Sequence, residues 1–147
     1  MSAAATPVGE RGNEMHLLLG GGETGGRLAL IHTVERRGGE PPRHRHRNED
    51  ELVYVLEGVI TVYADGTLYR LPAGSCLFLS RGGEHGYRVE SGEARLLTVL
   101  LPAGLEGYYR ELSATDAAPD IERVVTVAAR YGVEITGPAI AAAEVAP

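Results

Sequence analysis

The sequence predicts an all-β domain, an antiparallel sandwich or barrel, from the spacing of its apolar runs and from its turn signals. Between residues 15 and 101, glycine-containing breaks separate short apolar runs about every ten residues. Strands of this length with turns at this interval are typical of antiparallel sandwiches and barrels. Asp65-Gly66, between two β-rich runs, predicts a hairpin turn. The chain of 147 residues has room for one compact domain and contains no internal repeat.

The expected strands follow directly from the apolar runs. They are residues 15–19, 27–34, 51–56, 59–64, 67–71, 75–79, 85–89 and 94–101. The glycines of residues 20–26 are expected to form hairpin turns, because no strand–helix context for a phosphate-binding loop surrounds them.

The apolar spacing changes after Pro102 to that of helices. One helix is expected from Leu105 to Leu112 and another from Ile121 to Ala128, and both should cover one end or edge of the barrel. Asp120 before the second helix and Gly132 after it are typical boundary residues. The expected organisation is a flexible N-terminal arm (1–14), the barrel with its first helix (15–112), a C-terminal helix and extension (113–138) and a loose tail (139–147).

Composition and charge exclude several classes of function. A net charge of −6 and a pI near 5.4 disfavour nucleic acid or an anionic membrane as the main partner. No apolar run reaches the ~18 residues that a membrane helix needs, and no signal peptide is evident, so a cytoplasmic protein is expected. The single cysteine, Cys76, rules out an intramolecular disulfide and is expected to be a small buried residue.

The stretch from Arg43 to Arg47 carries the chemistry. Side chains alternate along a strand, so His44 and His46 face one side and the three arginines the other, toward solvent and beside Glu49 and Asp50. Glu51 begins the next strand and His85 a later one, which brings further ligand types to the same interior. Three imidazoles and a carboxylate suit a divalent transition-metal ion and leave positions for water or substrate.

These residues resemble the cupin superfamily, whose first signature is G-x5-H-x-H-x(3,4)-E-x6-G. The sequence meets every spacing of that signature with Gly38, His44, His46, Glu51 and Gly58. The resemblance covers roughly residues 27–101 and implies a cupin-type antiparallel barrel, or jelly roll, with one or two C-terminal helices. It also implies that the metal ligands are His44, His46, Glu51 and His85.

The second cupin signature, G-x5-P-x-G-x2-H-x3-N, is met at Gly74, Gly82 and His85. Ser80 replaces its proline and Val89 its asparagine, so the departures concern a turn and a strand interior and leave the ligand in place.

Four more residues are candidates for the pocket around the metal. His32 faces the same way as Leu30 and Val34, and if that side is inward it lines the cavity or joins the metal as a further ligand; an exposed or hydrogen-bonded strand histidine is the alternative. Tyr87 shares a face with His85, and lines the pocket or packs in the core. Val53 and Val55 share the face of Glu51 and would make the wall apolar.

Within the cupins, residues 29–112 are similar to the small quercetin-dioxygenase-like group and also to single-domain cyclases of aromatic polyketide pathways. The resemblance implies an enzyme for a hydroxylated aromatic, flavonol-like or polyketide-like small molecule. Three hypotheses stay open: an O2-dependent dioxygenase, a non-redox cyclase or isomerase, and a metal-dependent binding module. Glu51 is the candidate general base, and zinc, iron, nickel, manganese and copper all fit the ligand set. A homodimer is expected from the same resemblance.

Overall fold

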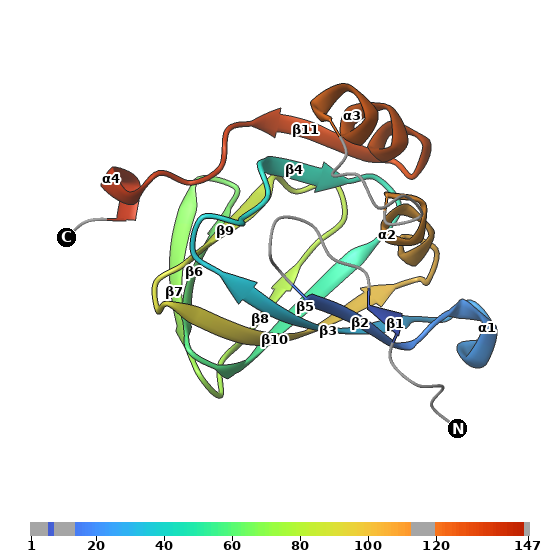
Figure 1. The fold of residues 1–147 in the computed structure, drawn as a ribbon, viewed down its shortest axis with the longest axis horizontal. Coiled ribbons are helices and arrows are strands. Elements are labelled where there is room, and N and C mark those ends of the chain that lie inside the picture. The colour runs from blue at the N-terminus through green and yellow to red at the C-terminus, as the bar shows by residue number, and fades with distance from the viewer. Residues whose placement is uncertain (1–5, 8–13, 113–119, 146–147) are drawn as a thin grey trace.

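The computed structural model describes residues 6–7, 14–112 and 120–145, and its strands form two antiparallel sheets (Figure 1). The six-stranded sheet has the order β1 (Thr6–Pro7), β2 (Glu14–Leu19), β3 (Ala29–Arg36), β10 (Glu93–Leu101), β5 (Asp50–Glu57) and β8 (Cys76–Leu79). The five-stranded sheet has the order β11 (Val133–Gly137), β4 (Arg43–His46), β9 (His85–Val89), β6 (Val59–Ala64) and β7 (Thr67–Pro72). The predicted all-β antiparallel fold is confirmed.

Turn chemistry closes the sheets where the sequence indicated. The β6–β7 hairpin turns at Asp65 and Gly66, both with positive φ (45° and 89°), so Ala64 pairs with Thr67 across a two-residue loop. Positive φ at both turn positions matches the right-handed twist of the flanking strands. The predicted hairpin is confirmed.

Two groups of buried apolar side chains form the core between the sheets. One contains residues of β5, β6, β8, β9 and β10, such as Val55, Ile60 and Val89, all with no exposed area. The other joins β3 and β10 to the helical end of the molecule, through Ile31, Leu100 and Leu105. The interior between the sheets is therefore apolar except where particular strands present polar side chains.

The helices of the described residues are α1 (Gly21–Thr24), α2 (Glu106–Leu112), α3 (Ile121–Arg130) and α4 (Ala142–Val145). Helices α2 and α3 lie where the apolar spacing predicted, at one end of the barrel, whereas α4 lies apart from them near the C-terminus (Figure 1). Helix α3 begins at Asp120, whose side chain accepts a hydrogen bond from the Arg123 backbone at 2.8 Å and so caps the helix. Helix α1 occupies part of the glycine-rich stretch that was expected to be hairpin turns. Among the described residues, no helix has the length and apolar character needed to cross a membrane.

The segment after α3 holds the main difference from the expected fold. The predicted extension contains β11, which joins the five-stranded sheet and pairs with β4, with Val133 opposite His46 and Ile135 opposite His44. At the other terminus, Thr6–Pro7 pairs with β2, while the rest of the predicted arm up to residue 13 lies outside the described residues. The end of the predicted tail forms α4 as far as Val145.

The arginines that alternate with the histidines of β4 do not simply point to solvent, as the sequence suggested. Arg43 is covered by the C-terminal segment: it pairs with Glu144 of α4, donates to the Pro138 carbonyl at 3.2 Å and lies over the Tyr63 ring at 4.6 Å. Asp50, expected beside these arginines, instead pairs with Arg81 at 3.3 Å.

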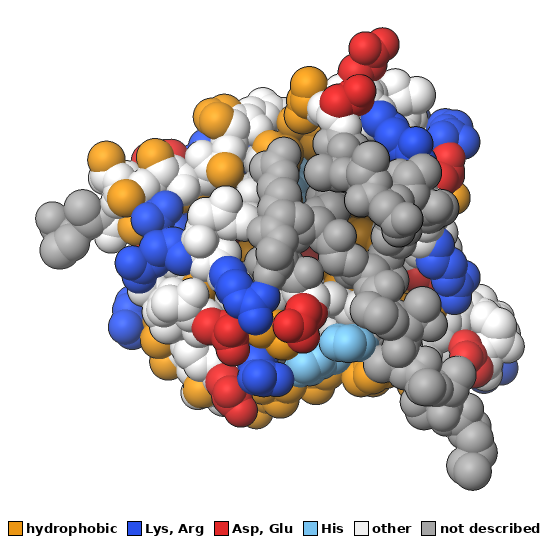
Figure 2. All heavy atoms as spheres, viewed as in Figure 1, with side chains coloured by type: hydrophobic (Ala, Val, Ile, Leu, Met, Phe, Trp, Pro, Cys, Tyr) orange, Lys and Arg blue, Asp and Glu red, His pale blue; other side chains and the backbone are white. Residues whose placement is uncertain are grey.

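Other surface features follow from strand alternation. Cys76 is exposed rather than buried, because β8 is an edge strand whose Leu79 faces the core while Cys76 and Phe78 face outward. Acidic and basic side chains are interspersed over the described part of the face shown in Figure 2, which carries no continuous basic patch there.

Candidate metal centre

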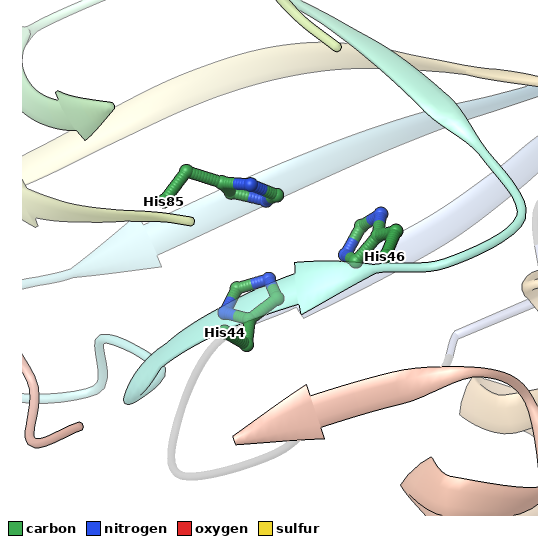
Figure 3. Close-up of side chains that lie close together, drawn as sticks. All are labelled: His44, His46 and His85. Carbon is green, nitrogen blue, oxygen red and sulfur yellow. The ribbon is translucent and has the colours of Figure 1, made fainter. Parts of the chain in front are cut away.

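The three predicted histidine ligands meet at one point between the sheets. His44 and His46 come from β4 and His85 from the start of β9, where His44 and His85 are direct cross-strand partners. One ring nitrogen of each lies within 4.8 Å of those of the other two. Figure 3 shows the three rings turned toward a common space, as the alternation along β4 predicted.

Glu51 approaches the histidines from the opposite sheet. It is in β5, and its Oε2 lies 3.4 Å from His46 Nδ1 and 3.5 Å from His85 Nε2. Histidine side chains from two strands of one sheet thus meet a carboxylate from the other sheet. All four predicted ligands are brought together.

Backbone carbonyls orient two of the rings. His44 Nδ1 lies 2.8 Å from the Pro42 carbonyl and His85 Nδ1 lies 3.2 Å from the Gly83 carbonyl, so both Nδ1–H groups donate there. This tautomer leaves each Nε2 with a free lone pair, the form that binds metals.

The donor atoms are buried without ordinary partners. Apart from their long contacts with Glu51 Oε2, at 3.4 Å and 3.5 Å, His46 Nδ1 and His85 Nε2 have no hydrogen-bond partner within the described part of the chain, although both are inaccessible to solvent. A buried polar atom without a partner is costly, and here the unpaired atoms belong to a nitrogen–oxygen donor set of the kind that divalent ions prefer. The residues present therefore fit a divalent metal ion.

The electrostatics keep most of this donor set in its metal-binding protonation state. Burial, together with the neighbouring His85 and His46, lowers the pKa of His44 to about 4, and burial also lowers the pKa of His46. Burial alone would raise the pKa of Glu51, but the hydrogen bond from His85 and the nearby imidazoles lower it to about 2. At neutral pH, His44 is neutral and Glu51 is ionised.

His85 behaves differently and predicts a pH dependence for metal affinity. Burial alone would lower its pKa, but the hydrogen bond and charge of Glu51 raise it above the usual value. Because a metal must displace the His85 proton, affinity should fall about 10-fold per pH unit below this raised pKa and level off above it. His44, with a pKa of about 4, competes only in more acidic solution. Chelator competition between about pH 5.5 and 8.5 measures this; constant affinity throughout would contradict it.

A cavity of about 170 Å³ opens beside the four candidate ligands. Its walls are mainly apolar side chains of both sheets, including Val53, Ile60 and Val62. Helices α2 and α3 close one end with residues such as Tyr109, Leu112 and Val124. The site is thus the polar part of a small, largely apolar pocket, the usual form of a small-molecule site.

The other predicted pocket residues divide into two groups. Tyr87 and Val53 line the cavity. Val55 does not line it, because it lies further along β5 and is fully buried in the core. His32 faces away from the cavity, opposite His16 of β2, with ring centroids 6.0 Å apart, so it does not join the metal centre.

Sequence reasoning missed the polar residues that β3 presents to the cavity. Ile31, Thr33 and Glu35 line it, so the inward face of β3 is the one opposite His32. Thr33 and Glu35 at alternate positions of an apolar strand were the available signal.

Comparison with known families agrees with this site. The family model described as "Cupin domain" matches residues 30–100, which include all four candidate ligands. The match spans 71 of the 147 residues and shows that this part of the chain is similar to cupin domains.

One curated relative resembles this chain over a longer stretch. Quercetin 2,3-dioxygenase of Bacillus subtilis is 28% identical over 102 residues, which are 69% of this chain. The matched stretch spans only 30% of the length of that dioxygenase.

Solved structures show the same fold. A predicted oxalate decarboxylase from Thermotoga maritima matches with a TM-score of 0.60 and 22% identity, over 69% of this chain and 96% of that one. An RmlC-like cupin from Shewanella frigidimarina matches with a TM-score of 0.59 and 23% identity, over 73% and 89% of the two chains. The polyketide cyclase RemF from Streptomyces resistomycificus matches with a TM-score of 0.55 and 23% identity, over 68% and 73%. At these identities the likeness concerns the fold.

Proposed function

We propose that this cupin is a metal-dependent enzyme for a hydroxylated aromatic, flavonol-like or polyketide-like small molecule, and that its reaction is an O2-dependent dioxygenation. The observation that carries the proposal is the convergence of His44, His46, His85 and Glu51 beside an apolar cavity. One divalent transition-metal ion held by these residues would supply Lewis acidity and, if redox-active, electron transfer to dioxygen.

The chain's own residues have separate tasks in this proposal. The three imidazoles and Glu51 hold the ion, and the backbone carbonyls of Pro42 and Gly83 fix the orientation of two rings. Glu51, ionised at neutral pH, is the candidate base for a substrate hydroxyl proton. The apolar wall around Val53 and Ile60 excludes water, which strengthens every charge interaction inside.

The choice of dioxygenation is supported by the similarity to quercetin 2,3-dioxygenase over 69% of this chain. Because the match spans 30% of that protein, the activity is proposed for this chain rather than carried over.

Oxygen consumption tests the proposal. Protein loaded separately with iron, nickel, manganese, copper or zinc is mixed with quercetin in an oxygen-electrode cell. We expect at least one redox-active form to consume about one O2 per quercetin lost, with zinc protein and Glu51→Gln protein as controls that consume little. No oxygen uptake with any metal form, across a panel of flavonols and enolisable ketones, would reject dioxygenation.

A non-redox cyclase or isomerase is the second candidate. It is favoured by proton-carrying side chains in the cavity beyond Glu51, because Glu35 and Tyr87 also line it and lie against each other. Cyclisation of a poly-β-ketone needs proton donors and acceptors around a polarised carbonyl and no oxidant. Conversion of such a substrate by zinc-loaded protein under strict anaerobiosis would establish this candidate. Any turnover at all excludes a binding module.

Two further proposals concern the molecule as a whole. Exposed apolar side chains of β5 and the edge strand β8, namely Tyr54, Leu56 and Phe78, support a homodimer. A cytoplasmic location stays a prediction.

A further inference from the structure

A second carboxyl group, Glu35, lies buried in the cavity wall away from the four candidate ligands. It is in β3, with Ile31 and Thr33 on the same cavity-facing side, and only 5% of it is exposed. Its Oε2 has no hydrogen-bond partner among the described residues, and neither has the equally buried Thr33 Oγ1. Two polar atoms are thus available at one place in an otherwise apolar wall.

The neighbouring Glu40 shows that burial alone does not explain Glu35. Glu40 is also buried and also lines the cavity, but its two oxygens accept backbone hydrogen bonds from Val89 at 3.1 Å and Gly38 at 2.8 Å. Glu40 therefore holds the end of β9 and the turn at Gly38 in place. No such backbone bond engages Glu35 Oε2, so the fold does not use this atom.

The surroundings of Glu35 favour a neutral, hydrogen-bonding group. Burial raises its pKa, the nearby hydroxyls of Tyr87 and Thr33 lower it and the charge of Glu40 raises it further. The neighbours that influence it in the described chain include no cation. Leaving such a group unpaired is costly, so a ligand atom that bonds to it recovers free energy that the folded protein alone does not.

Tyr87 connects this group to the candidate metal centre. It shares a face of β9 with His85 and lines the same cavity. Burial raises the pKa of the Tyr87 hydroxyl, and the charges of Glu35 and Glu51 raise it further. If a molecule in the cavity places one oxygen at the metal centre, the rest of that molecule lies beside Tyr87 and then beside Glu35 on the same wall.

We propose that Glu35, with Tyr87 and Thr33, is a second polar anchor that binds a hydroxyl or carbonyl group at the end of the substrate remote from the metal centre. The cavity then selects molecules with polar groups at both ends of an apolar middle, and Glu35 acts as a positioning and specificity-determining residue. This inference rests on the proposed function, because it takes the first polar end to be the oxygen held at the metal centre.

Paired probes test the anchor. The metal-bound protein is titrated anaerobically with 3-hydroxyflavone, which has only the metal-chelating end, and with its 2′-, 3′- and 4′-hydroxylated derivatives. We expect at least one derivative to bind wild-type protein about 10-fold tighter than the parent compound. Glu35→Leu should abolish that preference, measured as the ratio of the affinities of the derivative and the parent for the same variant. Glu35→Gln, which keeps a donor and an acceptor, should retain most of it.

The controls separate binding from folding. Glu134→Leu, which removes an exposed strand carboxyl outside the cavity, should keep the preference. Glu35→Leu should unfold at the same or a higher temperature, because it removes an unpaired buried carboxyl; a purely structural role predicts a lower one. If Glu35→Leu does not fold, Tyr87→Phe is titrated instead and should weaken the same preference.

The outcomes distinguish the two proposals. Metal-dependent binding of the parent with no preference for any hydroxylated derivative, or a preference that survives Glu35→Leu, overturns the anchor and leaves the proposed function standing. Failure of every probe to bind the metal-loaded protein contradicts the flavonol-like substrate class, and the anchor is rejected with it.

Discussion

Replacement of His85 by alanine is expected to remove nearly all bound metal from this protein. His85 contacts candidate ligands of both sheets, since its Nε2 lies 3.5 Å from Glu51 Oε2 and its ring centroid 4.5 Å from that of His44. Changes in the groups that merely orient ligands reduce affinity by about 10- to 100-fold, so loss of a ligand should cost at least about 100-fold. Metal analysis after gel filtration measures the remaining occupancy, and oxygen consumption should fall with it.

His32→Ala is the matched control for this experiment. His32 is also a strand histidine, but it lies on the outer face of β3 opposite His16 and outside the cavity. We expect His32→Ala to keep one ion per chain and wild-type affinity. Equal metal loss in the two variants would mean that the histidines act through general stability, and full occupancy in His85→Ala would contradict the proposed ligand set.

The metal centre was largely predictable because its pattern is short-range. His44 and His46 are two residues apart, so the period of a strand alone places both rings on one side, and the glycines around them set the turns that bring Glu51 and His85 close. The full set of four candidate ligands came from the resemblance to the two cupin signatures, because Glu51 and His85 lie on strands of different sheets. The same reasoning could not decide which face of β3 is inward, since that depends on how the two sheets pack. Because the inward face of β3 was undecided, the sequence analysis missed Glu35 and named His32 as a candidate pocket residue instead.

The unpredicted parts of the fold also depend on tertiary contacts. The residues of β11 alternate correctly, with Val133 and Ile135 facing the cavity, but a five-residue strand after a helix gives little signal by itself. Its pairing with β4 covers the side of the sheet where Arg43 would otherwise reach solvent. Arg43 was therefore predicted on the correct side of β4, opposite the histidines, but it was wrongly expected to be surrounded by solvent.

Gly58→Ala is expected to destabilise the fold severely. Gly58 connects β5 to β6 with φ at 83°, a conformation that costs a residue with a side chain roughly 1 kcal/mol. A Cβ atom there would lie 2.5 Å from the Glu93 carbonyl oxygen and 2.9 Å from Ala94 Cα. Both contacts are backbone atoms of β10, which pairs with β3 and β5 at the centre of its sheet and so resists displacement. The combined loss should be about 3 kcal/mol or more in free energy of unfolding, measured by urea denaturation.

The other glycine of the first cupin signature provides the comparison. Gly38 has a similar φ of 92°, but a Cβ atom built on it would have no atom within 4 Å. Gly38→Ala should therefore cost only the conformational part, about 1 kcal/mol. Glycine is then required at the two positions for different physical reasons. At position 38 only the positive φ requires it, whereas at position 58 the close approach of β10 also leaves no room for a side chain. Equal losses in the two variants would show that backbone conformation alone sets both, and that the close approach of β10 relaxes at little cost.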